Sequence, residues 1–282
     1  MIGIISQDNI NKVGHGLFLN FRMALRNYLK QEFKNINNVQ DLDAVDILII
    51  VDEHYQPHVD VWKNDLFIAA LNFKCIKTVV FNFERINSKS FPWNVDHQKK
   101  LETIKNLIQF VSDVEDAALY KKQFVNKQYL SRDAAFIAPV REKKERILFM
   151  GQVNGYYPTR GKIITDLIAT GMPFDVVITN RKYTYIEYLE KINEYKWILN
   201  PLGTGIFINL RFYEALKLGC IPVQQVTENM AGWYDELPGS FKFTNVDQIA
   251  FNLLQKFEPV RREFYLEDYF ESIALEAFFN QK

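Results

Sequence analysis

A glycine-bearing loop leads into a short predicted helix whose first turns carry an arginine and a glutamate. The loop contains Gly203 and Gly205, and the helix carries Arg211 and Glu214 on one face, because residues three apart are neighbours on a helix surface. Free backbone N–H groups and the helix dipole at such a helix start favour an anion. The arginine and the carboxylate could hold a charged group together with a pair of hydroxyls. This combination suits a nucleotide-sugar better than a bare phosphate.

The elements around this loop alternate between strands and helices. The loop follows an apolar strand, and its helix leads into a buried strand entered through Cys220-Ile221-Pro222-Val223. Such alternation predicts an α/β fold with a parallel sheet. In this half of the chain we expect strands at 147–150, 174–178 and 197–199, and helices at 160–170, 184–194 and 246–257.

The same alternation occupies the first half of the chain. Strands are expected at 2–6, 46–51, 77–83 and 135–138, and helices at 17–33, 61–72 and 96–108. The charged run 141–146 precedes the point at which the alternation starts again, so we interpret it as a linker. The sequence therefore predicts two Rossmann-like lobes, residues 1–142 and 143–282. The aromatic-rich stretch 261–279 is expected to be helical and could pack back onto the first lobe.

The bulk composition excludes several classes of partner. The 282 residues include 34 basic and 34 acidic side chains, so the formal net charge is zero and gives no overall attraction for nucleic acid or an anionic membrane. The two cysteines, Cys75 and Cys220, lie far apart in apolar runs, which favours free thiols over a disulfide. No apolar run approaches the ~20 residues that span a bilayer, and the N-terminus has no signal-peptide pattern. We therefore expect a soluble, cytoplasmic protein.

Three segments of the second half resemble the exostosin-like glycosyltransferases. Arg211–Leu216 followed by Gly219–Val223 resembles the central signature of that family. Phe149-Met150-Gly151, with Arg160 downstream, is similar to the element that begins the family's nucleotide-binding half. Residues 195–203 are similar to the strand that enters its glycine loop. The resemblance covers roughly residues 147–245, and the first lobe carries no matching motif.

The resemblance implies a GT-B fold, in which two Rossmann-like lobes face each other across a cleft. Members transfer a sugar from a nucleotide diphosphate donor, usually a UDP-sugar such as UDP-xylose, UDP-glucuronic acid or UDP-GlcNAc. The transfer proceeds with inversion to a hydroxyl of a glycan or glycoconjugate, without an obligatory metal or other cofactor. Eukaryotic members carry an N-terminal membrane helix, which this chain lacks. The resemblance therefore points to a soluble bacterial or viral relative with its donor mainly on the C-terminal lobe.

An inverting transfer needs a group that stabilises the leaving diphosphate. For this role we expect Arg211 and Arg160, together with the loop backbone. An ordinary ion pair of Arg211 with Glu214 or Asp235 is the structural alternative. In the donor site Glu214 would accept hydrogen bonds from ribose hydroxyls, as a fixed carboxylate does well. The other predicted donor-binding residues lie on the loops that follow strands of this lobe: Gly151, Asn180, Tyr183, Tyr185, Pro201, Gly203, Thr204, Gly205 and Asn209.

The base that deprotonates the acceptor hydroxyl is expected in the first lobe. Ligands of parallel sheets bind beyond the carboxyl ends of the strands, and the cleft between two such lobes is the expected site. A carboxylate can take the proton as the new bond forms, and a histidine titrates near neutrality. The unranked candidates follow the first three strands of this lobe: Asp8, His15, Asp52, Glu53, His54 and Glu84.

Two alternatives to a UDP-sugar transferase stay open. One is a GT-B enzyme that uses a GDP-sugar, as in fucosyl transfer, and the other is a two-lobed sugar- or nucleotide-binding protein without catalytic activity. A metal-dependent site is not expected, although Asp41-Leu42-Asp43 matches the Asp-x-Asp element of manganese-dependent transferases. The match precedes a strand, on the side of the sheet away from the predicted cleft.

Overall fold

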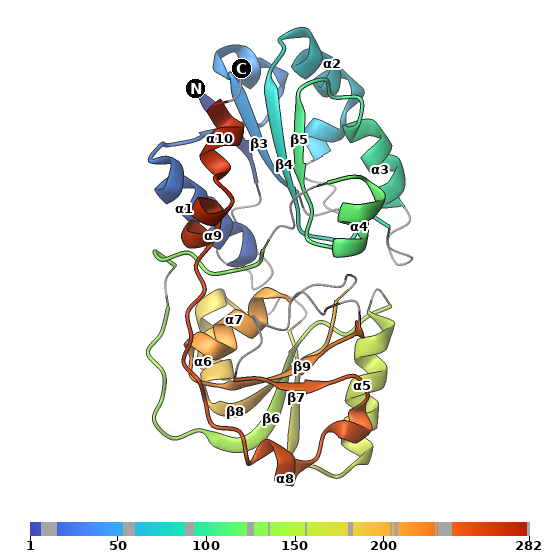
Figure 1. Ribbon diagram of the computed structural model, residues 1–282, viewed down its shortest axis with the longest axis vertical. Coiled ribbons are helices and arrows are strands. Elements are labelled where there is room, and N and C mark those ends of the chain that lie inside the picture. Colours follow the sequence, from blue (N-terminus) through green and yellow to red (C-terminus); the bar gives the residue numbers. More distant parts are fainter. Residues whose placement is uncertain are drawn as a thin grey trace. The chain divides into compact units, whose positions relative to one another are not determined.

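The protein folds into two compact α/β units (Figure 1). The computed structural model describes residues 1–6, 16–52, 60–87, 93–122, 127–134, 136–155, 157–179, 183–203, 205, 208–228, 230 and 239–280. Unit 1 contains the first strand, residues 18–132 and the chain from residue 266 onward, and unit 2 contains residues 133–265 together with residues 16 and 17. The chain therefore passes from unit 1 to unit 2 earlier than the expected boundary at 142/143, and it returns to unit 1 at its C-terminal end.

Unit 1 is built on a parallel five-stranded sheet of order β2-β1-β3-β4-β5. The central strands are continuous apolar runs, as strands covered on both faces should be. Three of the expected strands are confirmed to within one or two residues. The strands are β1 (Ile2–Ile5), β2 (Lys34–Asn35), β3 (Ile47–Asp52), β4 (Lys77–Asn82) and β5 (Leu107–Phe110).

Two expectations for this unit are wrong. The expected strand at 135–138 is not formed, because residues 136–138 have no regular secondary structure. The expected helix 96–108 is too long, since α3 (Trp93–Leu101) ends seven residues earlier and Leu107–Phe110 form β5. A short apolar run gives the same local signal in a helix and in a buried strand, so the pairing of β5 with β4 decides the outcome.

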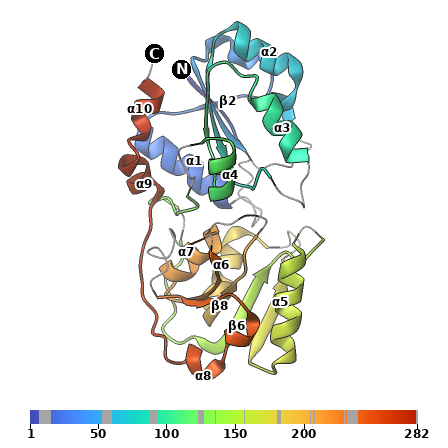
Figure 2. The ribbon, with the colours of Figure 1, turned by 45° about the vertical axis from the view of Figure 1, so that its right-hand side comes forward.

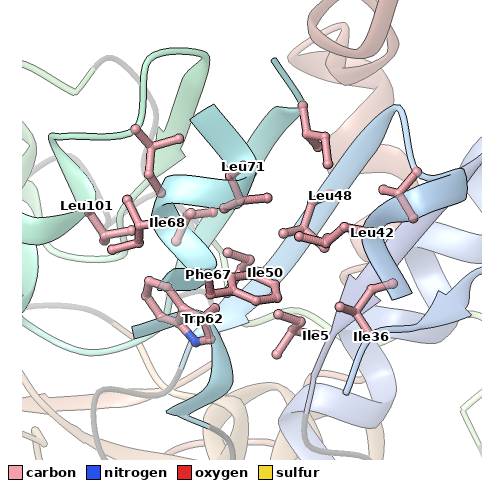
Figure 3. Close-up of a cluster of buried hydrophobic side chains, with 14 residues drawn as sticks. Ile5, Ile36, Leu42, Leu48, Ile50, Trp62, Phe67, Ile68, Leu71 and Leu101 are labelled. Atoms are coloured by element: carbon pink, nitrogen blue, oxygen red, sulfur yellow. The ribbon is translucent and has the colours of Figure 1, made fainter. Parts of the chain in front are cut away.

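Helices cover both faces of this sheet (Figure 2). On one face α1 (Gly16–Leu29) packs with α9 (Leu266–Ser272) and α10 (Leu275–Asn280), and Phe21 of α1 contacts Phe81 and Phe270 edge to face. On the other face lie α2 (Asp65–Phe73) and α3. Figure 3 shows the apolar cluster there, in which Phe67 and Leu71 lie against Leu48 and Ile50. The short helix α4 (Val114–Leu119) follows β5.

Unit 2 repeats this design with a parallel sheet of order β10-β9-β8-β6-β7. Helix α5 (Pro158–Ala169) covers one face, while α6 (Tyr185–Asn193) and α7 (Leu210–Lys217) cover the other (Figure 2). The short helix α8 (Phe251–Leu254) follows the sheet. The strands are β6 (Lys144–Gly151), β7 (Phe174–Ile178), β8 (Tyr195–Asn200), β9 (Ile221–Gln225) and β10 (Phe241–Phe243).

The charged run 141–146 is only partly the linker that its composition predicts. Strand β6 begins at Lys144, so the second half of the run is the exposed start of that strand. Its side chains pair with charged residues of neighbouring elements, Lys144 with Glu194 and Arg146 with Asp175. A charge run therefore extends the sheet here, because neighbouring elements supply opposite charges.

The two sheets share one topological feature that bears on ligand binding. In each unit the chain builds outward from its first strand to one edge, then crosses back and builds to the other edge. This reversal creates a switch point between the first and third strands, and ligands of open α/β sheets bind beyond the carboxyl ends of strands at that point. In unit 2 the switch point lies between β6 and β8, and in unit 1 it lies between β1 and β3.

Within the described ranges, none of the helices combines the length and the apolar character that crossing a membrane requires.

Candidate functional site at the switch point of unit 2

The strands on either side of the switch point in unit 2 end at Gly151 and Asn200, and α7 places Arg211 between them. Helix α7 starts after the N-cap residue Asn209. It stops at Leu218, because Gly219 takes a left-handed conformation with φ of 66° that favours glycine. This short helix fixes the place of Arg211 in its first turn.

Arg211 is half-buried and contacts the ends of both strands. Its Nη1 donates to Asn200 Oδ1 at 3.4 Å, and its guanidinium lies 5.3 Å from the ring centre of Phe149. A Cβ atom added to Gly151 would lie 2.6 Å from Arg211 Nη2, so the guanidinium occupies the space that a side chain at this position would take. Among the described residues, Arg211 Nε has no hydrogen-bond partner. The guanidinium thus keeps donor capacity next to the switch point.

Glu214 lies one helical turn after Arg211 and is buried, with 2% of its surface exposed. Tyr185 Oη donates to Glu214 Oε1 at 2.8 Å. Tyr188 also hydrogen-bonds to the Glu214 carboxylate and interacts with Arg211. A continuous network therefore links Tyr185, Glu214, Tyr188 and Arg211.

The local sequence explains why both tyrosines face this carboxylate. Thr184 and Glu187 form a capping box, so α6 begins at Tyr185. Tyr185 and Tyr188 are three residues apart and therefore lie on the same, buried face of α6.

Burial dominates the protonation behaviour of this network. It raises the pKa of Glu214 to about 7, although the two tyrosine hydrogen bonds and the charge of Arg211 oppose the rise. Burial likewise raises the pKa of Tyr188, and the neighbouring Glu214 carboxylate adds to that rise. Both shifts have the sign expected when a group that becomes negative is removed from water.

Buried carboxamides connect the ends of β8 and β9. Asn200 Nδ2 donates to Gln224 Oε1 at 2.5 Å, and both side chains are fully buried. Gln225 Oε1 accepts the backbone N–H of Leu202 at 2.9 Å, which holds the start of the glycine loop against β9. Arg211 therefore donates to an amide that is itself fixed by a neighbour.

Arg160, the second predicted diphosphate ligand, joins two loops at the same edge. It is buried, and its guanidinium stacks 3.9 Å above the ring of Tyr157. Its Nε donates to the carbonyl of Leu202, and its Nη1 donates to the carbonyl of Gln152, each at 3.4 Å. These bonds tie the loop after β6 to the loop after β8. A Cβ on Gly203 would lie 3.4 Å from Arg160 Nη2.

The other predicted donor-site residues have different surroundings. Pro201 and Gly205 are buried, and Tyr183 is half-buried against the apolar cluster that covers this face. Asn209 caps α7 without a side-chain hydrogen bond to the helix, and its Oδ1 has no partner in the described part of the chain. Asn180 and Thr204 lie outside the described residues.

Most of the candidate bases lie where the structure gives no description. Asp8, His15, Glu53 and His54 are outside the described residues. The backbone of Asp52 ends β3 at the switch point of unit 1, but its side chain is not described. Glu84 is half-buried after β4, one strand away from the pair that flanks that switch point.

The Asp41-Leu42-Asp43 element has structural partners. Asp41 accepts the backbone N–H groups of Asn37 and Asn38, which holds the pKa of its carboxyl below the ordinary value. Asp43 pairs with Lys74. In the ranges that the structure describes, no group of three or more histidine, cysteine, aspartate or glutamate side chains is arranged to hold a metal ion.

Tyr188, Asn200 and Gln224 are residues of this site that were not predicted from the sequence, and so are Tyr157 and Gln225. The spacing of Tyr188 from Tyr185 on one helix face is a signal that could have identified it. Asn200 and Gln224 end two apolar strands, and polar residues at that position belong to the edge where ligands bind.

Comparison with protein-family models finds no match for this chain, and a search of curated proteins finds none. The fold and the site define the protein as an α/β protein with two parallel five-stranded sheets and a cationic, polar cluster at the switch point of the second sheet.

Proposed function

We propose that the chain is a glycosyltransferase of GT-B architecture that binds the diphosphate of a nucleotide-sugar donor at the switch point of unit 2. The observation that carries the proposal is the half-buried guanidinium of Arg211. It lies over Gly151, and its Nε has no hydrogen-bond partner among the described residues. A buried donor without a partner costs free energy, so a site that keeps one is suited to an anionic ligand. Arginine matches phosphate oxygens better than any other side chain, because its planar fork donates two parallel hydrogen bonds.

The proposed reaction uses Arg211 on the leaving group. An oxygen of the acceptor hydroxyl attacks the anomeric carbon of the donor sugar, and the bond from that carbon to the β-phosphate oxygen breaks. Negative charge then develops on the diphosphate, where a fixed cation stabilises the transition state more than the ground state. The hydroxyl proton passes to a general base, for which Asp8, His15, Asp52 and Glu53 are the candidates from the sequence.

The test is a panel of nucleotide-sugars, including UDP- and GDP-linked donors, measured by thermal shift and by donor hydrolysis. A ligand that binds the folded state stabilises it by about 2.7 kcal/mol at 100 times its Kd. We expect a UDP-sugar to raise the melting temperature and to be consumed with chelator present. A response to GDP-sugars alone would select the fucosyl-type alternative. If a nucleotide-sugar stabilised the protein but was neither consumed nor transferred, the protein would be a binding protein without catalytic activity. If no nucleotide stabilised the protein, the proposal would be refuted.

A further inference from the structure

We propose that Tyr185, Tyr188 and Glu214 are positioning residues that hold the Arg211 guanidinium in its diphosphate-binding orientation and do not contact the ligand. This inference rests on the proposed function. It differs from the sequence-based expectation that Glu214 binds ribose hydroxyls and Tyr185 contacts the base.

Burial is the first observation that supports a positioning role. Glu214, Tyr188 and Tyr185 expose only 2%, 4% and 6% of their surfaces. The two tyrosines belong to the apolar cluster between α6, α7 and the sheet, in which Leu148, Met150 and Ile198 are buried, and Glu214 is buried beside them. A ribose could reach the carboxylate only if this packing opened.

The hydrogen bonds give the second observation. Both tyrosines bond to the Glu214 carboxylate, and Tyr185 does so at 2.8 Å. A carboxylate in an apolar interior needs such donors, because the burial of an unpaired charge is costly. Since its partners are protein side chains, Glu214 can serve as a fixed anchor for the cation beside it.

The path from this anchor to Arg211 gives the third observation. Tyr188 interacts with both Glu214 and Arg211, so its hydroxyl links the anchor to the guanidinium. On the opposite side Gly151 leaves room for Arg211 Nη2, and Asn200 accepts from Nη1. These contacts restrict a long side chain that would otherwise lose considerable rotamer freedom on binding a ligand.

The experiment measures the affinities of the full chain for UDP, 2′-deoxy-UDP and uridine by calorimetric titration, using E214Q and Y185F. The glutamine keeps the size of the glutamate, and phenylalanine removes only a hydroxyl. We expect E214Q, which removes the charge, to weaken UDP binding about tenfold, and Y185F, which removes one of the donors to the carboxylate, to weaken it about threefold. Uridine affinity should be unchanged. In an R211K background E214Q should have no further effect, since coupled residues are not additive.

Y195F is the matched control. Tyr195 Oη also donates to a carboxylate, that of Asp175, at 2.9 Å, but Tyr195 begins β8, at the opposite end of the strand from Asn200. This variant should lose stability without losing UDP affinity. Either of two results would overturn the positioning role. One is an additive loss of UDP affinity in E214Q and R211K. The other is that E214Q abolishes the discrimination between UDP and 2′-deoxy-UDP, because Glu214 would then contact the ribose.

A separate readout keeps the inference testable if no nucleotide binds at all. Urea unfolding of wild type, E214Q, R211K and the double variant gives the coupling between the two side chains without any ligand. A non-additive cycle together with absent nucleotide binding would refute the proposed function and leave the coupling to Arg211 intact. An additive cycle would refute the positioning role itself.

Discussion

Units 1 and 2 share one strand order and differ in what surrounds their buried acids. In unit 2 the partners of Glu214 are side chains, two tyrosines and, through Tyr188, Arg211. In unit 1 the buried Asp116 accepts the backbone N–H groups of Ile86 and Asn87. An acid that binds backbone groups fixes a loop, whereas an acid that binds side chains fixes another side chain. Unit 1 also holds a cation beside a buried acid, since Arg85 pairs with Asp113, but these residues follow β4 and β5, which do not flank the switch point.

The positions of these acids in the two sheets differ as well. In unit 1 the buried side chains of Asn82 and Gln109 hydrogen-bond to each other at the ends of β4 and β5, and Asp116 lies on α4, which follows β5. The switch point of this unit is between β1 and β3, in a different part of the sheet. The cluster of unit 2 lies at the ends of β6 and β8, which do flank the switch point. One topology therefore supports a scaffold in one unit and a candidate binding site in the other.

Removal of an arginine should affect turnover strongly in unit 2 and only stability in unit 1. We expect R211A to lower turnover by a factor on the order of 10² or more, since one charge partner of the transition state is removed. R85A serves as the comparison, because Arg85 pairs with Asp113 and Glu115 within unit 1. It should reduce stability and leave UDP affinity within about twofold. Near-normal turnover of R211A, measured by donor consumption, would remove Arg211 from the mechanism.

The second prediction compares the two buried acids through pH. Burial raises the pKa of Glu214 from 4.5 to about 7, so between these values the folded state binds a proton that the unfolded chain has released. Unfolding free energy therefore falls as pH rises through this window, by about 3 kcal/mol relative to the non-titrating variant E214Q. Urea unfolding from pH 4.5 to 8 measures this difference.

Asp116 should give the same sign in a more acidic window. Its pKa is raised, chiefly by burial, from 3.8 to about 6. The stability difference between wild type and D116N should therefore fall as pH rises from about 4 to 6 and stay constant above that range. Parallel pH profiles for wild type and E214Q would contradict the account of Glu214.

The third prediction concerns the space under Arg211. In G151A the new Cβ would lie 2.6 Å from Arg211 Nη2, and the flexible arginine should move while the fold is retained. We expect UDP affinity to fall about tenfold, the loss of roughly one charged hydrogen bond. The control is G155A, because a Cβ on Gly155 meets no atom within 4 Å. Equal UDP affinities of the two variants would show that Arg211 does not need this space.

Changes in the Asp41-Leu42-Asp43 element should have little effect on activity. Asp41 accepts backbone N–H groups and Asp43 pairs with Lys74, so each carboxylate already has a structural partner. We expect D41N to lower the melting temperature slightly, and we expect D41N and D43N to retain transfer activity with chelator present. If wild-type activity strictly required manganese and D41N and D43N abolished that activity, the Asp-x-Asp metal site would be established.

Strands and helices could be predicted from the sequence where an apolar run ends at a charged, glycine or capping residue. Phe174–Ile178 is strand β7 as predicted, and the Thr184–Glu187 capping box starts α6. The errors arose where the local pattern does not distinguish a helix from a strand. Leu107–Phe110 is an example, because this segment is a strand through its pairing with β4. The charged start of β6 is another case, because Lys144 and Arg146 find their partners only in the folded sheet.

The candidate site shows the same limit. The sequence indicated that Arg211 and Glu214 share a helix face, and the structure brings Arg211 to the ends of β6 and β8. Sequence alone could not indicate that Glu214 is buried behind two tyrosines, because burial depends on how α6 and α7 pack on the sheet. The sequence does not distinguish a polar helix residue that contacts a ligand from one that supports a neighbouring side chain.

Calorimetric titration of wild type and R211A with UDP and GDP, each compared with its nucleoside, tests whether Arg211 binds the diphosphate. We expect the matching nucleoside diphosphate to bind about 30-fold more tightly than the nucleoside, which corresponds to about 2 kcal/mol from charged hydrogen bonds. In R211A most of this advantage should disappear. Equal affinities for diphosphate and nucleoside, or an advantage that R211A retains in full, would contradict the assignment of the diphosphate to Arg211.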